Sequence, residues 1–272
     1  MSPLKEKEEW IGRYDAGEKL DDIASAYNVS RQTVTNYVSR FRSIRHRGPQ
    51  SKMRHEDYFD EIDTEEKAYF LGWLMADGCV AIANGQYSLK INIAYKDKEL
   101  IEKFQKAIGS THHLLKRNHK KNGASHQSAY VSITSRHMCE SLMKLGVIPR
   151  KTGKEIISPI KEKFVRHFIR GYFDGDGITN CKNGKRRSGF ISSSEVLQGI
   201  QKRLGTNIKC FHPNNTKTEN VYYFESGIRF SKKLYKYIYK DATIWLSRKR
   251  KRMDTICGNT EITVSNKSEA AS

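Results

Sequence analysis

The sequence predicts an α+β protein in which two pseudo-symmetric copies of one αββαββα unit follow a small all-α domain. Residues 70–78 (FLGWLMADG) and 169–177 (IRGYFDGDG) repeat one pattern at an offset of 99. Residues 97–109 and 193–205 repeat a second, helical pattern at an offset of 96. Because the order of the two patterns is the same in both halves, duplication of one fold unit is the simplest cause.

The elements of each copy follow from local patterns. Thr64, followed by two glutamates, is typical of a capped helix start, and this helix is expected to end near Ala76. Alternating apolar residues predict a strand over 87–95 and two more near 112–119 and 128–134, and helical spacing predicts helices over 97–108 and 136–145. The first copy is assigned to residues 61–160 and the second, which repeats the order, to 161–256.

The first 42 residues carry two short amphipathic patterns and predict a helix-turn-helix domain. Leu20, Ile23, Ala24 and Tyr27 form one apolar face, and Val34, Tyr37, Val38 and Phe41 form the other. Between them, Asn28 suits a tight turn and Ser30 suits a helix cap. The outward side chains are then candidates for DNA contact: Arg31, Gln32, Thr33, Thr35, Asn36 and Arg40. An ordinary helical hairpin with a polar outer face is the alternative.

Charge supports a polyanionic partner. The chain has 49 basic and 30 acidic residues, a net charge of +19. Residues 43–60 lack periodicity and predict a basic linker, and residues 257–272 predict a disordered tail.

Several classes of protein are disfavoured. No apolar run approaches the roughly 18 residues that span a bilayer, and the N-terminus lacks an apolar signal core, so we expect an intracellular protein of the cytoplasm or nucleoid without a membrane partner. The five cysteines include no CxxC pair and are interpreted as reduced thiols. The nine histidines show no spacing typical of metal ligands.

The repeated pattern indicates where chemistry could occur. Gly72 with Ala76, and Gly171 with Gly175, place small residues on one face of each helix, so that the two helices could pack closely. Their ends would bring Asp77 and Asp176 together, and two like charges need a cation or a proton between them. Mg²⁺ prefers such oxygen ligands. One copy alone would indicate only a capped helix with a surface aspartate; two copies favour a site.

A basic pair follows each motif at nearly the same distance. Arg150-Lys151 corresponds to Arg248-Lys249, and each lysine lies 74 or 73 residues after its aspartate. The run at 248–252 (RKRKR) could be a nuclear localisation signal, but its place on the predicted closing helix favours contact with a DNA backbone.

The two motifs resemble those of a LAGLIDADG homing endonuclease in its single-chain, two-repeat form, over roughly residues 60–256. The resemblance implies two sheets forming a saddle over a long double-stranded DNA target. It also implies a metal site at Asp77 and Asp176, with Gly78 and Gly177 beside them, that holds roughly two or three Mg²⁺ ions with Mn²⁺ as a substitute.

The resemblance also implies catalytic basic residues, which we assign to Lys151 and Lys249, with Lys154 as the rival in the first half. Met75 replaces the first motif acid, whereas Asp174 retains it; Asp174 is interpreted as a helix-end or supporting residue rather than a metal ligand. The termini lack the residues of intein self-splicing, which favours a freestanding or intron-encoded protein.

The sequence therefore predicts a monomeric, Mg²⁺-dependent DNA endonuclease used in intron homing. Two alternatives remain at this point: a DNA-binding transcription regulator that does not cleave, and an intron maturase that binds intron RNA.

Overall fold

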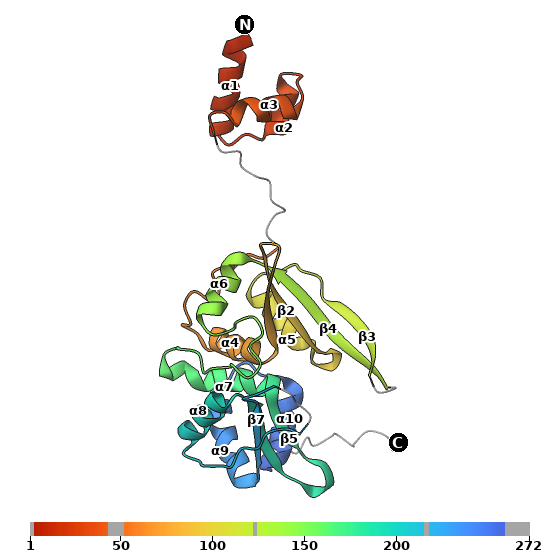
Figure 1. The fold of residues 1–272 in the computed structure, drawn as a ribbon, viewed down its shortest axis with the longest axis vertical. Coiled ribbons are helices and arrows are strands. Elements are labelled where there is room, and N and C mark those ends of the chain that lie inside the picture. Colours follow the sequence, from red (N-terminus) through yellow and green to blue (C-terminus); the bar gives the residue numbers. More distant parts are fainter. Residues whose placement is uncertain (1–2, 43–51, 122–123, 215–217, 259–272) are drawn as a thin grey trace, which may run out of the picture. The chain divides into compact units, whose positions relative to one another are not determined.

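The structure is a computed structural model that describes residues 3–42, 52–121, 124–214 and 218–258. The chain divides into two units, Met1–Ser51 and Lys52–Ser272 (Figure 1). Each unit has its own hydrophobic core. No helix within the described ranges is both long and apolar enough to cross a lipid bilayer.

The described part of the first unit contains three helices rather than the two predicted: α1 (Pro3–Asp15), α2 (Leu20–Ala26) and α3 (Arg31–Val38). The predicted turn is confirmed, because Asn28 has a φ of 48° and the Ser30 hydroxyl accepts from Thr33 N at 3.1 Å. Helix α1 contributes the buried side chains of Trp10 and Tyr14. The core of this unit consists of Trp10, Tyr14, Leu20, Ile23, Ala24, Val34 and Val38.

The predicted packing of Phe41 on the apolar face of the second helix is wrong. Helix α3 ends at Val38, so the helical period on which Phe41 was placed does not continue. Its side chain is 53% exposed and lies beside Tyr37, with ring centroids 5.4 Å apart.

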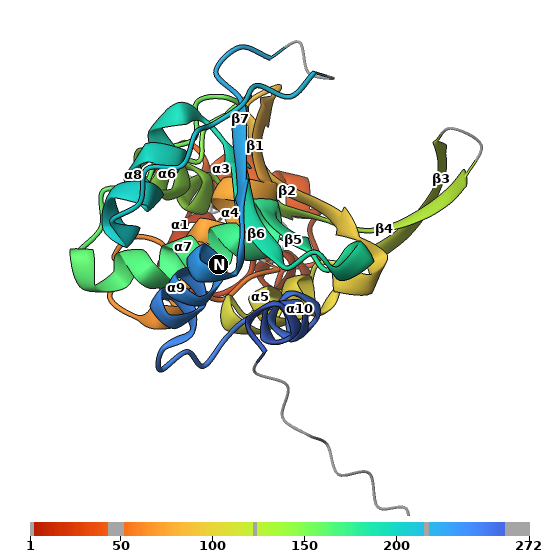
Figure 2. The same cartoon turned by 90° about the horizontal axis from the view of Figure 1, so that it is seen from below.

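The first repeat has the predicted αββαββα order. Its elements are α4 (Glu65–Asp77), β1 (Gly78–Ala83), β2 (Gln86–Ala94), α5 (Glu99–Ala107), β3 (Leu115–Lys121), β4 (Ala124–Thr134) and α6 (Arg136–Lys144). The four strands form an antiparallel sheet in the order β1-β2-β4-β3. Figure 2 shows the β3–β4 hairpin extending beyond the rest of this repeat.

The second repeat follows the same order with one strand fewer in its described part. Its elements are α7 (Glu162–Asp176), β5 (Gly177–Asn180), β6 (Arg187–Ser192), α8 (Ser194–Leu204), β7 (Tyr222–Ser226), α9 (Ile228–Tyr239) and a closing α10 (Ser247–Cys257). The predicted fourth strand is reduced to an isolated antiparallel bridge between Phe211 and Tyr223. Pro213 follows closely and has no N–H with which to extend the pairing.

Each sheet buries one face under its helices. Alternate residues of β4, Ala129, Val131 and Ile133, are fully buried, whereas Lys90 and Asn92 of the adjacent β2 are exposed on the other face. In the second sheet, Phe190 and Phe224 form the buried side. The helices therefore leave the other face of the first sheet open for contact.

Helices α4 and α7 pack at the closest range that backbones allow. A Cβ atom added at Gly72 would lie 1.9 Å from Phe168 O, and one added at Gly171 would lie 1.8 Å from Tyr69 O. One added at Gly175 would lie 2.4 Å from the Ala76 Cβ atom. Close contact through small residues is thus present at both repeats of the motif, and it holds the two helix ends together.

The predicted linker over 43–60 is too long. Residues 43–51 lie outside the described ranges, but Met53 and Phe59 are buried in the core of the second unit, 4% and 1% exposed. These apolar side chains were overlooked within a basic stretch. Of the predicted tail, Cys257 is buried at the end of α10, and residues 259–272 lie outside the described ranges.

Candidate active site and nucleic-acid interface

Asp77 and Asp176 are the last residues of α4 and α7, which pack against each other. A Cβ atom added at Gly175, the neighbour of Asp176, would lie 3.0 Å from Asp77 Oδ2. Both aspartates are half-buried. The close helix packing thus brings the two acidic tips together, as the repeated motif predicts.

The two carboxylates oppose each other's ionisation. Burial, followed by the charge of Asp176, raises the pKa of Asp77 to about 7, while Lys249 and Lys151 act in the opposite direction. Burial also raises the pKa of Asp176. A positive charge between them would favour the ionised form of both.

Lys151 and Lys249 lie at equivalent places beside this pair. Lys151 Nζ donates to Ala76 O at 2.8 Å, and Lys249 Nζ donates to Gly175 O at 2.9 Å, the same position one repeat later. Both lysines are buried, 9% and 5% exposed, and burial lowers the pKa of Lys249 to about 8. Each ammonium therefore neutralises the negative end of its motif helix next to the carboxylate.

The rival Lys154 does not reach the site. Its side chain is exposed, and only its backbone N–H contacts Lys151, by donating to the carbonyl oxygen at 2.6 Å. Of the two candidates in the first repeat, the geometry favours Lys151.

Asp174 contacts the segment before the closing helix, and its role as a supporting residue rather than a ligand stays a prediction. Its Oδ2 atom accepts from Tyr69 OH and from Leu246 N, each at 2.7 Å, just before α10 begins. Met75, at the equivalent place in the first motif, is fully buried in the core.

Part of the basic run at 248–252 is used inside the protein, and DNA contact by the run stays a prediction. Arg248 forms a two-pronged ion pair with Asp97 at 2.8 and 2.7 Å, Lys249 is buried, and Arg250 bonds Asp254 at 3.2 Å. Only Lys251 and Arg252 are exposed. Long-range partners such as Asp97 give no signal in the local sequence.

Three residues of the site were missed. Trp73 donates from Nε1 to Asp77 Oδ2 at 3.0 Å, and a hydrogen bond from Tyr172 lowers the pKa of Asp176. Each aromatic residue lies four positions before its aspartate, a spacing that could have identified both. Glu155 is also buried near Lys151 and Asp176, and burial raises its pKa. It lies in an irregular segment between the repeats, where no pattern marks it.

The donor set suits a hard divalent cation that keeps part of its water shell. Two partly accessible carboxylates are suitable oxygen ligands, and their mutual repulsion would be relieved by such an ion. Within the described ranges, no group of three or more His, Cys, Asp or Glu residues has the geometry of a metal site, so water and substrate oxygens would complete the shell. Of the two predicted glycines, Gly78 starts β1, and the Gly177 carbonyl already accepts from Lys249 Nζ at 2.6 Å.

Comparison with known families supports this organisation. Residues 64–144 match the family of LAGLIDADG-like domains, and residues 6–49 match a family of helix-turn-helix domains. Residues 64–144 therefore resemble a LAGLIDADG-like domain, and residues 6–49 before them resemble a helix-turn-helix domain.

Solved structures of other proteins are similar to this chain in fold. The homing endonuclease I-WcaI, solved bound to its DNA recognition sequence, superposes with a TM-score of 0.51 at 12% identity, covering 75% of this chain and 94% of that chain. Full-length DUF199/WhiA from Thermatoga maritima matches with a TM-score of 0.45 at 14% identity, over 78% of this chain and 68% of that one.

A curated relative is the DNA-directed RNA polymerase subunit Rpo1C of Methanocaldococcus jannaschii, 28% identical over 172 residues. The match covers 62% of this chain, which corresponds to 19% of the relative, so the chain spans about a fifth of that protein's length.

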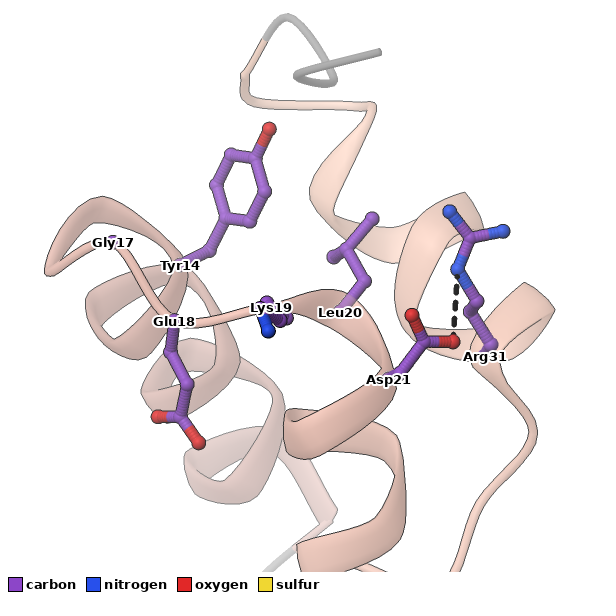
Figure 3. Close-up of a pocket in the computed structure, with 7 residues that line it drawn as sticks. All are labelled: Tyr14, Gly17, Glu18, Lys19, Leu20, Asp21 and Arg31. Carbon is purple, nitrogen blue, oxygen red and sulfur yellow. Dashed lines mark ion pairs between the residues drawn. The ribbon is translucent and has the colours of Figure 1, made fainter. Parts of the chain in front are cut away.

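In the helix-turn-helix domain, the six predicted contact residues lie on the outer side of α3 or just after it. Arg31, Gln32, Thr33, Asn36 and Arg40 are exposed and Thr35 is half-buried. Figure 3 shows Arg31 paired with Asp21 of α2, Nε to Oδ1 3.1 Å. Gln32 Nε2 donates to Asn36 Oδ1 at 2.7 Å on the same face. These polar groups lie outside the core and are accessible to a ligand.

The second unit offers another basic surface that was missed. Strand β3 exposes Lys116, Arg117, His119 and Lys120 on the extended β3–β4 hairpin (Figure 2). Arg117 lies over the ring of Tyr130 on β4, 3.4 Å from its centroid, which orients the guanidinium. The basic run in residues 116–121 was a visible signal, but it was interpreted only as a strand.

Proposed function

We propose that this protein is a site-specific, Mg²⁺-dependent endonuclease that cuts both strands of double-stranded DNA at a long target site. The observation that carries the proposal is the duplicated centre. Each motif helix ends in an aspartate with a buried lysine on the carbonyl before it, and the close packing of α4 and α7 places the two sets side by side. A duplicated centre suits two antiparallel strands, one scissile phosphate for each half.

Asp77 and Asp176 would hold the divalent cation, with Trp73 and Tyr172 orienting the two carboxylates. When bound, such an ion supplies a water of lowered pKa and stabilises the leaving oxygen of a phosphodiester. Lys151 and Lys249 are fixed by carbonyl oxygens and place positive charge where a phosphate accumulates negative charge during the reaction.

Duplex binding would use surfaces outside this centre. The open face of the first sheet and the β3–β4 hairpin supply cations to phosphates, and α3 supplies polar side chains that suit base edges in a major groove. Most of this binding would weaken with salt, since phosphate contacts release counterions. A single chain carries both halves of the proposed centre.

The test is cleavage of a plasmid that carries a site selected from a random DNA library. We expect linear product with the wild type in Mg²⁺ or Mn²⁺ and none in EDTA. Asp77→Asn and Asp176→Asn should stop cutting while duplex binding in Ca²⁺ persists. Asp57→Asn, an exposed aspartate outside the site, is the matched control.

Unimpaired cutting by the double Asp77→Asn, Asp176→Asn variant would refute the assignment of the centre. Tight duplex binding by the wild type without cutting in either metal would refute the nuclease and identify a DNA-binding regulator. The two outcomes are separable because binding and cleavage are measured on the same plasmid.

A further inference from the structure

A basic groove lies on the helical side of the second repeat, away from its strands. Helices α7, α8 and α9 line a pocket of about 410 Å³, and all of its lining residues lie on these helices or just after α9. The polar and aromatic members are Arg166, Arg203, Lys233, Lys236, Tyr237 and Lys240. We refer to these six residues as the α9 groove.

Three lysines of the α9 groove face no acid. Lys233, Lys236 and Lys240 follow one another at helical spacing and are exposed, and none forms an ion pair with any described residue. The two arginines differ: Arg203 bonds Glu162 at 2.9 Å, and Arg166 lies 3.8 Å from Asp241. The groove thus carries an excess of positive charge concentrated on one edge of α9.

The first repeat carries only part of this charge, because Lys236 has a basic counterpart there, Lys144, whereas Lys233 and Lys240 have none. When α6 is aligned with α9 by their cap residues, Lys233 corresponds to Ser141, which donates to Asp60 Oδ1 at 2.6 Å. In the same alignment, Tyr237 corresponds to Leu145 and Lys240 to Ile148. The buried positions Met138 and Leu142 coincide with Phe230 and Leu234, which supports the register.

The groove also contains a flat aromatic side chain among its cations. Tyr237 is half-buried between the lysines, and burial raises the pKa of its hydroxyl, so the ring stays neutral. Cations that follow a phosphate backbone, combined with an aromatic platform for a base, are the pattern of single-strand binding. A volume of about 410 Å³ lies within the range of roughly 300–1,000 Å³ that small ligands occupy, which is sufficient for a nucleotide.

We propose that the α9 groove is a second nucleic-acid site, which holds the phosphates of a single strand on Lys233, Lys236 and Lys240 and stacks one base on Tyr237. The site is on the helical side of the domain, whereas the proposed duplex surface is on the strands. It is independent of cleavage and could be occupied while duplex DNA is bound.

The test is fluorescence anisotropy of the full chain with a labelled oligouridylate and a labelled oligothymidylate of about 12 nucleotides. Changing Lys233, Lys236 and Lys240 to Gln should weaken binding at least about 10-fold in low salt and reduce the magnitude of the salt slope by about 2, or about 0.7 for each phosphate left without its lysine. The matched control changes Lys202, Arg229 and Lys232 to Gln, which are also exposed on α8 and α9 and remove the same charge. The control should bind nearly as the wild type does.

A second variant separates stacking from charge. Tyr237→Leu, which installs the first-repeat residue, should weaken a base-containing strand about fivefold and leave an abasic strand unchanged. Binding of the oligouridylate alone would assign the site to RNA, recognised through its 2′-hydroxyls. Binding of both the oligouridylate and the oligothymidylate would assign it to single strands in general.

Three results would overturn the proposal: equal binding by the lysine variant and its control, no effect of Tyr237→Leu, or displacement of the strand by an acidic peptide at equal charge. Duplex binding and plasmid cutting by both charge variants report on folding and on the proposed nuclease separately. A failure of the nuclease assay therefore leaves the result for the groove intact.

Discussion

Arg170 of α7 donates from Nη2 to Glu65 Oε1 at 2.6 Å, across the interface between the two repeats. The guanidinium is fully buried and also donates to Ile244 O at 2.8 Å and Ile238 O at 2.9 Å. Glu65 begins α4, and the two carbonyls flank the turn before α10. One charged group therefore ties the first motif helix to the segment that positions Lys249.

Glu65→Gln should destabilise the second unit by about 3 kcal/mol, because it leaves the buried guanidinium of Arg170 without a compensating charge. Urea unfolding measures the decrease in stability. Glu61→Gln is the matched control: Glu61 pairs with Lys161 at 3.1 Å, but both side chains are about two-thirds exposed, so we expect a change within roughly 0.5 kcal/mol. Equal decreases in the two variants would contradict the role assigned to Arg170.

Acid should destabilise the protein partly through His167. Burial and the charge of Arg170 lower its pKa from 6.5 to about 4. Between these values the unfolded chain binds a proton that the folded chain does not, so stability is full above pH 6.5 and falls toward pH 4, by at most about 3 kcal/mol from this group. His167→Gln keeps an acceptor for Arg170 and should flatten the fall, as measured by urea unfolding across this range.

His137 provides a control of opposite sign. It is exposed and bonds Asp60 at 2.8 Å, which raises its pKa. Removing it with His137→Gln should make the protein more sensitive to acid. If both histidine variants change the pH dependence in the same direction, the assignment to burial of His167 is wrong.

The tightly packed glycines predict the strongest effects of a single added methyl group. Gly72→Ala and Gly171→Ala place Cβ within 2 Å of a backbone oxygen, so the helices must separate, at a cost of at least about 2 kcal/mol. Thermal unfolding measures this. Gly227→Ala meets no atom within 4 Å and should cost about 0.5 kcal/mol or less. A cost for Gly72→Ala no larger than that of Gly227→Ala would show that the helices can move apart freely.

The helix pair and its acidic ends could be predicted because duplication presents the same local pattern twice, and Gly72 and Gly171 leave a steric signal in the sequence. Helix α1 could not, since its sequence is highly charged and, among its described side chains, Trp10 and Tyr14 alone are buried. Strand β1 was expected from the αββαββα order but was not located, because it begins at Gly78 with no loop after α4. Ion pairs such as Arg248 with Asp97 depend on the folded chain and have no local pattern.

Removing Met1–Ser51 should leave DNA cutting intact and shorten the footprint, because this unit has a core of its own. The salt slope of duplex binding should decrease in magnitude by about 0.9 for each phosphate that the shortened protein no longer neutralises. The deletion must stop before Met53 and Phe59, which belong to the core of the second unit. A longer deletion that extends to residue 59 should therefore unfold more readily, which makes it a useful comparison. An unchanged footprint and slope would show that α3 does not touch DNA.

The central claim is that Asp77 and Asp176 bind one divalent-cation centre jointly. Terbium luminescence tests it without any reaction, since Trp73 donates to Asp77 at 3.0 Å and can sensitise an ion held there. Trp73→Phe removes this sensitiser and thereby controls for energy transfer from Trp10 and Trp245. We predict a signal that Mg²⁺ displaces and that Trp73→Phe, Asp77→Asn and Asp176→Asn each abolish. A signal that persists in Asp176→Asn, or none in the wild type, would contradict a shared centre.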